Sequence, residues 1–218
     1  NEMNAPILYA DQVLKVGYSM FSPDGKQIFN LRKGEKVVYE NLRLDLLGKY
    51  QSKNICSAIV AIEQLQNLGW NIHESAILRG LEKVTQNTGL LGRWQTIGAN
   101  PRIICDTGHN EAGIREVVAQ IIQTPYKKLH FIIGMVNDKD IVSVLAQLPK
   151  DAEYYFTKAS MPRSMDEKQL MKMAVYFNLK GESYPTVAEA LKAARKNSDP
   201  EDLIFIGGSS FVVAEAIP

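Results

Sequence analysis

The stretch RIICDTGHNEAGIREVVAQII, residues 102–122, decides the fold of this chain. It begins with an apolar run of strand length, passes through the polar turn CDTGHNEAG (105–113), and continues with apolar residues at helical spacing: Ile114, Val117, Val118, Ile121 and Ile122. A strand that leads through a short turn into an amphipathic helix indicates a βα unit. The turn carries Asp106, His109 and Asn110, and it is either an ordinary polar turn or part of a site.

The same alternation continues to the end of the chain. Apolar runs of strand length alternate with helical patterns, in the order 129–135 (strand), 140–148 (helix), 153–159 (strand), 165–177 and 186–197 (helices) and 203–208 (strand). Strands that alternate with helices imply βαβ units. The sequence therefore predicts a Rossmann-like α/β domain, with a mainly parallel sheet and helices on both faces.

Residues 7–47 have a different pattern, with short β-like runs and the turn signal Pro23-Asp24-Gly25 between two of them. This pattern predicts an antiparallel meander. Two helices are predicted after it, from Ser52 to Leu68 and over about 73–85. The glycine-bearing stretch TQNTGLLG at residues 85–92 then indicates a hinge, and we expect two domains, residues 1–88 and 89–218.

Composition argues against several classes of partner. The 25 Lys and Arg against 24 Asp and Glu, a formal net charge of +1, give no general field to attract nucleic acid or an anionic membrane. No run approaches the ~18 apolar residues of a membrane span, and no signal peptide is visible. Cys56 and Cys105 lie in a helical and a strand pattern without zinc-site spacing. We expect no metal ligands, buried thiols and a cytoplasmic protein, cut from a longer chain because it lacks an initiator methionine.

Polar residues gather where the predicted strands end. Ligands of an open α/β sheet bind outside the carboxyl ends of its strands. The strands here end in Asp106 and His109, residues 134–140, Lys158 and Arg163, and residues 207–210. Each also has a structural interpretation, with Asn110 and Ser209 as helix caps and Asp138 as a turn residue. Taken together, these residues favour a functional site at this edge of the sheet, but the periodicity does not show which kind of site it is.

Missing motifs narrow the chemistry. The first turn reads DTGHNEAG where a dinucleotide-binding domain needs G-x-G-x-x-G, which argues against hydride transfer. The sequence contains neither a G-x-x-x-x-G-K-[ST] loop nor a G-x-S-x-G nucleophile elbow. The chain by itself therefore lacks the loop that cradles a triphosphate.

Four motifs, in order over roughly residues 41–216, resemble a known family. They are LLGKYQSKNICSAIVAIEQL (46–65), LLGRWQTI with PRIICDTGHNEAG (90–113), FIIGMVNDKDI (131–141) and IFIGGSSFVVAEA (204–216). Gly-Arg followed by a strand and Asp-x-x-His-Asn is similar to the start of the C-terminal domain of folylpolyglutamate and dihydrofolate synthases, in the Mur ligase superfamily. The chain resembles the back half of such an enzyme: an antiparallel β and helical remnant of the central ATPase domain, then the complete C-terminal domain.

The resemblance implies an ATP-dependent amide ligase. In this family ATP phosphorylates the terminal carboxylate of the substrate, and the amine of L-glutamate attacks the acyl phosphate. The implied cofactors are ATP and Mg²⁺, and the implied substrates are L-glutamate with dihydropteroate or reduced folate polyglutamates. The P-loop and the magnesium ligands belong to the other half of the enzyme, so this chain alone is expected to be inactive. The family is usually monomeric.

The resemblance also implies roles for single residues. For the nucleotide, Asn54 would hydrogen-bond adenine, Arg93 would reach the phosphates and Asp106 would accept from the ribose. The catalytic residues would be His109 and Asp106. For glutamate, His109 would handle the ammonium group, Ser209 would bind a carboxylate, and Lys139 and Arg163 would be further carboxylate partners.

The sequence departs from the family pattern at two places. Tyr50-Gln51 stands where the family often has His-Gln, and Asp-Thr-Gly-His-Asn stands where it has Asp-Gly-Ala-His-Asn. Two alternatives stay open. The chain could come from another Mur-type ligase, which adds amino acids to a UDP-linked cell-wall precursor, or it could be a binding module for a nucleotide or an amino acid without turnover.

Overall fold

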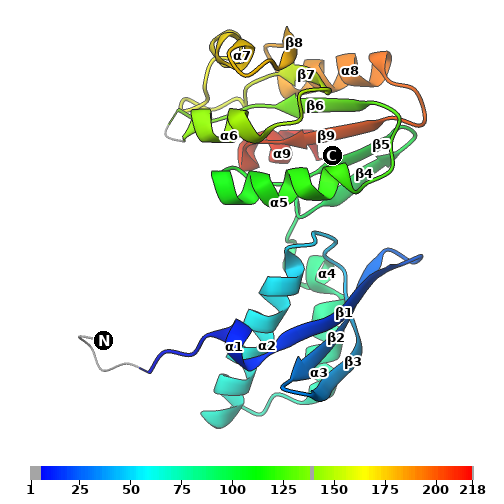
Figure 1. Cartoon of the computed structure of the whole chain (residues 1–218), viewed down its shortest axis with the longest axis vertical. Coiled ribbons are helices and arrows are strands. Elements are labelled where there is room, and N and C mark those ends of the chain that lie inside the picture. The colour runs from blue at the N-terminus through cyan, green and yellow to red at the C-terminus, as the bar shows by residue number, and fades with distance from the viewer. Residues whose placement is uncertain (1–5, 138–139, 218) are drawn as a thin grey trace. The chain divides into compact units, whose positions relative to one another are not determined.

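The chain folds as two compact units, Asn1–Leu91 and Gly92–Pro218 (Figure 1). The computed structural model describes residues 6–137 and 140–217. The glycine-bearing stretch predicted as a hinge holds the end of α4 (Val84–Thr88), where Gly89 takes a left-handed conformation with φ of 68°. A left-handed glycine after the last helical residue ends a helix without steric cost.

The first unit is built on an antiparallel sheet of order β1-β2-β3, which confirms the predicted meander. Its elements are α1 (Ala10–Val13), β1 (Lys15–Ser22), β2 (Lys26–Lys33), β3 (Lys36–Leu44), α2 (Gln51–Asn67), α3 (Glu74–Glu82) and α4. Alternate side chains of β2, such as Phe29 and Leu31, are fully buried, as expected for a strand with one face on a core. They pack in one cluster with Ile55 and Ile59 of α2.

The second unit contains a six-stranded sheet of order β4-β5-β9-β6-β7-β8. The strands are β4 (Gln95–Ala99), β5 (Arg102–Cys105), β6 (Leu129–Ile133), β7 (Glu153–Phe156), β8 (Lys180–Ser183) and β9 (Leu203–Gly207). All neighbouring strands are parallel except β4, which is antiparallel to β5. The predicted Rossmann-like, mainly parallel sheet is confirmed. The short strands β4 and β8 were not predicted, because each lies at an edge and carries few apolar residues.

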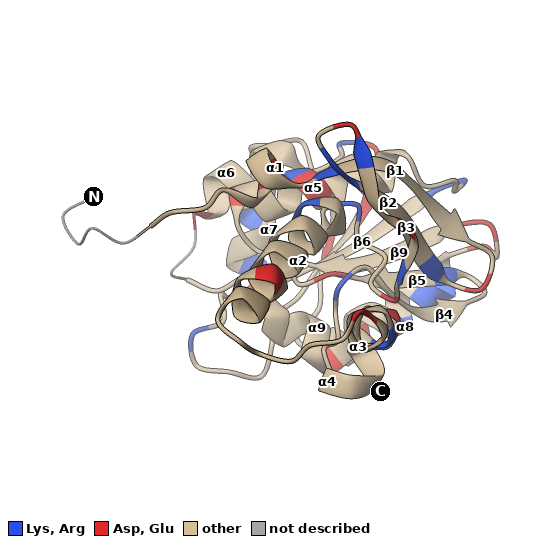
Figure 2. Ribbon diagram, turned by 90° about the horizontal axis from the view of Figure 1, so that it is seen from below, with Lys and Arg blue, Asp and Glu red and all other residues tan. Residues whose placement is uncertain are grey.

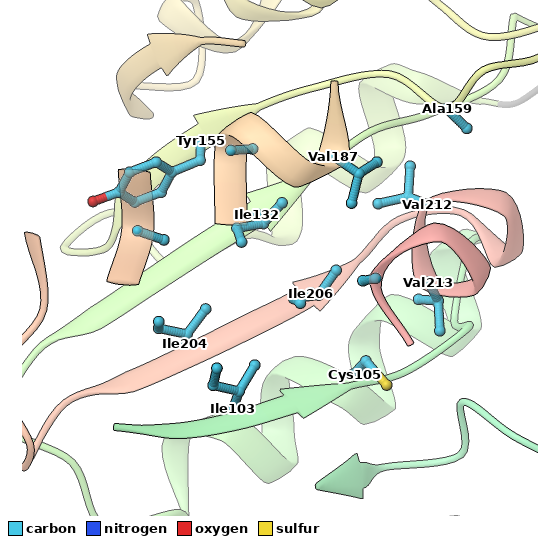
Figure 3. Packing of buried hydrophobic residues seen from close by; sticks show 13 residues of the cluster. Ile103, Cys105, Ile132, Tyr155, Ala159, Val187, Ile204, Ile206, Val212 and Val213 are labelled. Atoms are coloured by element: carbon cyan, nitrogen blue, oxygen red, sulfur yellow. The ribbon is translucent and has the colours of Figure 1, made fainter. Parts of the chain in front are cut away.

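Helices cover both faces of this sheet (Figure 1). They are α5 (Glu111–Ile122), α6 (Ile141–Gln147), α7 (Glu167–Val175), α8 (Val187–Asn197) and α9 (Ser210–Ala216). Ile132 and Ile206 of the strands pack with Val187 of α8 and with Val212 and Val213 of α9 (Figure 3). Every residue of β6 and β9 is buried, which explains why these strands are continuous apolar runs.

The strand order brings four loops to one edge of the sheet. The last strand, β9, lies between β5 and β6. The loops after β5, β9, β6 and β7 therefore leave neighbouring carboxyl ends, where ligands of such sheets bind. Charged residues of both signs are spread over both units (Figure 2). Within the described ranges, no helix is long and apolar enough to cross a membrane.

Candidate functional site

Asp106 organises the loop that follows β5. Its side chain is buried, with 2% of the residue exposed. One carboxylate oxygen accepts from the backbone N–H of Trp94 and the other from that of Gly108, each at 2.8 Å. The backbone N–H of Asp106 donates to the carbonyl of Ile206 in β9 at 3.1 Å. The carboxylate therefore ties the segment before β4 to the loop after β5, and its predicted contact with ribose stays a prediction.

The segment Gly92–Trp94 runs against this loop in an unusual backbone conformation. Gly92 has a φ of 71°, and a Cβ added there would lie 2.7 Å from the methyl group of Thr107 and 2.8 Å from Val213. The carbonyl of Gly92 accepts from the backbone N–H of Thr107 at 2.9 Å. Both the left-handed φ and the close packing require glycine here, which gives a physical reason for the Gly-Arg motif.

Arg93 lies against this loop because the residues on both sides of it, Gly92 and Trp94, hydrogen-bond to the loop through their backbones. Its guanidinium Nη1 donates to the hydroxyl of Thr107, and the side chain is half-buried. A guanidinium carries five N–H donors in a planar fork, so donors remain for an anion. The structure thus gathers Arg93, Asp106 and His109, three residues that were predicted from the sequence to belong to a site, around one short loop.

The imidazole of His109 is held by the backbone of the same loop. Its Nδ1 lies 2.9 Å from the carbonyl oxygen of Thr107. A carbonyl oxygen can only accept, so Nδ1 carries the hydrogen and Nε2 of the neutral ring keeps its lone pair. The half-buried ring can therefore accept a proton at Nε2 while Nδ1 stays anchored.

Asn110 has the structural role that was predicted for it. Its side-chain oxygen accepts from the backbone N–H of Gly113 at 2.8 Å and caps α5. An N-cap satisfies one of the N–H groups that the first helical turn leaves without a partner.

Ser209 caps a second helix at the same edge of the sheet. It follows β9, is 3% exposed, and its hydroxyl accepts from the backbone N–H of Phe211 at the start of α9 at 3.2 Å. Gly208 before it has a φ of 87°, and a Cβ there would come within 2.8 Å of the carbonyl of Gly134 after β6. The serine is firmly placed, while its predicted contact with the glutamate carboxylate stays a prediction.

The loops after β6 and β7 contact each other through their backbones. The N–H of Asn137 donates to the carbonyl of Arg163 at 3.0 Å, and Val136 forms a β-bridge with Ser164. The side chain of Arg163 is exposed. Asp138 and Lys139, which also have predicted roles, lie outside the described residues.

Lys158, at the end of a predicted strand, is engaged by the start of α7. Its ammonium lies 2.7 Å from the buried carboxylate of Glu167 and 3.4 Å from Asp166. The hydrogen bond to Glu167 raises the pKa of Lys158 above its usual value. This lysine therefore anchors the loop after β7, and the structure gives Arg163 the more accessible charge.

Asn54 belongs to the first unit. It lies on the exposed side of α2, and its amide nitrogen donates to the side-chain oxygen of Gln51 at 2.8 Å. This contact orients the amide, and its predicted contact with adenine stays a prediction. Among the described residues of both units, no group of three or more His, Cys, Asp and Glu could hold a metal ion.

One residue of the site, Thr107, was not predicted from the sequence. It stood out only as a departure from a family pattern, yet it contacts Gly92, Arg93 and His109. No local pattern could have found it, because its contacts join residues up to fifteen positions apart along the chain.

The fold and this loop define the class of the protein. Residues 92–210, more than half of the chain, match the family described as Mur ligase, glutamate ligase domain. The chain belongs to the Mur ligase family, and the resemblance drawn from its motifs is confirmed.

Particular relatives narrow the comparison to folate enzymes. A probable bifunctional folylpolyglutamate synthase/dihydropteroate synthase of Haloferax volcanii is 33% identical over 81% of this chain and 20% of its own length. Escherichia coli FolC in complex with DHPP and ADP is 26% identical, with a TM-score of 0.74 over 94% of this chain and 45% of that one. A bifunctional folylpolyglutamate synthase/dihydrofolate synthase with Mn, AMPPNP and L-glutamate bound is 25% identical, with a TM-score of 0.71 and the same coverage. The chain spans less than half of each of these proteins.

Proposed function

We propose that this chain is the C-terminal part of an ATP-dependent ligase that joins L-glutamate to a folate. One observation carries the proposal: within the stretch that matches the glutamate ligase domain, Arg93 and His109 both contact Thr107 beside Asp106. A fixed cation can stabilise the negative charge of phosphates, and a ring nitrogen that accepts a proton can serve the attacking amine, so both groups suit amide formation through an acyl phosphate.

The reaction would proceed in two steps. A carboxylate oxygen of the folate attacks the γ-phosphorus of ATP, ADP leaves, and an acyl phosphate forms. The amine of L-glutamate then attacks the acyl carbon, the amide bond forms, and inorganic phosphate leaves. The ammonium group of glutamate must lose a proton before it attacks, and Nε2 of His109 is the acceptor we assign to that proton. Arg93 would stabilise negative charge on the phosphates.

The proposed reaction uses a nucleotide and a divalent metal ion. Relatives hold ADP in one structure and Mn with AMPPNP in another, which supports a nucleotide and a divalent cation for this protein, and we propose ATP and Mg²⁺. The described residues offer no cluster of metal ligands. We therefore derive no step through the cation and assign its ligands mainly to the N-terminal part of a full-length protein.

Glutamate would be held at the same edge of the sheet. We assign one carboxylate of the amino acid to Ser209 and to the N–H groups beside it. Arg163 is exposed on a neighbouring loop and would pair with a carboxylate, and Lys139 is a further partner. The protein would act in the cytoplasm as a monomer, for which size-exclusion chromatography with light scattering is the measurement.

The deciding experiment is a ligase assay on the full-length protein that carries this sequence. It would be incubated with ATP and L-glutamate together with dihydropteroate or a reduced folate, and product mass and ADP release would be followed. We expect a product heavier by one glutamyl residue. Activity on a UDP-linked peptide precursor with none on any pteridine would instead identify another Mur-type ligase. The 218-residue chain alone is expected to turn over no ATP.

A further inference from the structure

We propose that Thr107 is a positioning residue that orients two groups of the site through different atoms. Its hydroxyl would hold Arg93 for the phosphates of the nucleotide, and its backbone carbonyl would hold His109 for the amine of glutamate. The inference rests on the ligase function proposed above, and the two contacts can be separated by mutation.

The hydroxyl acts on Arg93. Nη1 of the guanidinium donates to Oγ1 of Thr107, while the donors on Nη2 and Nε still suit an anion. A long side chain that is ordered before the ligand arrives loses less conformational entropy on binding. The Thr107 hydroxyl therefore increases the affinity for the phosphates without contacting them.

The orientation of the hydroxyl is itself determined by packing. The methyl group of Thr107 lies 2.7 Å from the place where a Cβ of residue 92 would stand, a space left open only because that residue is glycine. The backbone N–H of Thr107 donates to the carbonyl of Gly92 at 2.9 Å. Since a β-branched side chain has few χ1 states, fixing the methyl group also fixes the hydroxyl towards Arg93.

The carbonyl acts on His109. It lies 2.9 Å from Nδ1 of the imidazole, and this contact keeps the lone pair of the neutral ring on Nε2. Any residue at position 107 offers a carbonyl, but only serine or threonine offers a hydroxyl with this reach.

The test compares Thr107→Val and Thr107→Ser in the full-length protein. Valine keeps the shape and the carbonyl but removes the hydroxyl, so we expect the KM for ATP to rise by up to about tenfold, the size of the entropy cost of ordering one long side chain on binding. The KM for L-glutamate should stay within about twofold. Serine keeps the hydroxyl but lacks the methyl group that fixes it, so Thr107→Ser should raise the KM for ATP less than Thr107→Val does. Thr124→Val is the matched control, because it removes a hydroxyl bonded to the carbonyl of Gln120 at 2.9 Å outside the site.

Two results would overturn the role of Thr107. One is a KM for ATP that is unchanged in Thr107→Val but raised in Arg93→Ala. The other is a KM for ATP that is raised in Thr107→Ser but not in Thr107→Val, which would indicate that the side chain only fills space. ¹⁵N NMR on the 218-residue chain gives a readout that is independent of turnover. Thr107→Val should free the Arg93 guanidinium and leave the His109 tautomer unchanged. That NMR pattern without any ligase turnover by the full-length wild type would refute the proposed function and leave the orientation by Thr107 standing.

Discussion

The backbone N–H of Trp94 donates to the carboxylate of Asp106 at 2.8 Å, across twelve positions of the chain. Trp94 has a φ of 50°, a left-handed conformation that is uncommon for a bulky residue. Its ring is buried and packs against Phe205, with the ring centroids 5.7 Å apart. The Asp106 carboxylate and this ring packing together stabilise the left-handed backbone of Trp94. Arg93 therefore lies between Gly92 and Trp94, two residues whose backbones hydrogen-bond to the loop after β5.

Replacing the Asp106 carboxylate should destabilise the second unit. Asp106→Asn leaves one oxygen for two backbone donors and turns an NH₂ group towards one of them, so we expect a loss of about 2 kcal/mol in the free energy of unfolding. Urea unfolding followed by Trp94 fluorescence in a Trp70→Phe background reports on this unit. Asp151→Asn, on an exposed residue, should change stability by less than ~0.5 kcal/mol. Equal stabilities of the two variants would contradict the bracing role.

Removing the cap of α9 should have a smaller effect. Ser209→Ala leaves the N–H of Phe211 without its side-chain acceptor, and we expect a loss of about 1 kcal/mol. Ser210→Ala, on the exposed first residue of the same helix, is the control. The same fluorescence-detected unfolding compares the two, and a larger loss at the exposed serine would refute the assignment of the cap.

Acid should weaken the second unit through Asp202, at the opposite edge of the sheet. Burial raises the pKa of Asp202, but hydrogen bonds from the backbone N–H of Asp199 and from His130 outweigh it, so the pKa lies below its usual value. The carboxylate also accepts from the N–H of Lys128 at 3.0 Å. A lowered folded-state pKa contributes stability that is full above the unfolded pKa, about 3.9, and is lost as the pH falls through the folded value.

The contribution of Asp202 can be measured as the slope of the free energy of unfolding against pH. In Asp202→Asn we expect the free energy of unfolding to fall less between about pH 5 and pH 2.5 than in the wild type, and to be lower at pH 7. Glu201→Gln is the control, because Glu201 is exposed and its ion pair with Lys127 is long and weak, at 3.9 Å. A mutant whose acid limb stays as steep as that of the wild type would show that other groups drive the acid loss.

Both thiols should be unreactive in the folded chain. Burial raises the pKa of Cys105 to about 12 and raises that of Cys56 as well, so the reactive thiolate is scarce near neutral pH. Ellman's reagent should label neither cysteine within minutes at pH 7.5 and should label both in guanidinium. Rapid native labelling of Cys105 would contradict its burial.

Much of the fold could be predicted because its signals are local. The apolar run of β5, the stripe on α5 and the turn at Pro23 each lie within a few residues, and periods of 2 and 3.6 distinguish strands from helices. The two edge strands, β4 and β8, were not predicted because short polar strands show no such period. The place of β9 between β5 and β6 escaped as well, because pairing between distant strands leaves no local trace.

The sequence by itself determined the alternation of strands and helices, the cap at Asn110 and the motifs of a Mur ligase, since these depend on residue types at short spacing. Only the tertiary structure decided that the Asp106 carboxylate braces Trp94 and that Thr107 links Arg93 with His109. These contacts depend on left-handed φ angles at Gly92 and Trp94 and on the pairing of β4 with β5. These side chains meet because the folded backbone brings distant segments together. The free energy of such contacts depends on the whole fold, so no single stretch of the sequence encodes it.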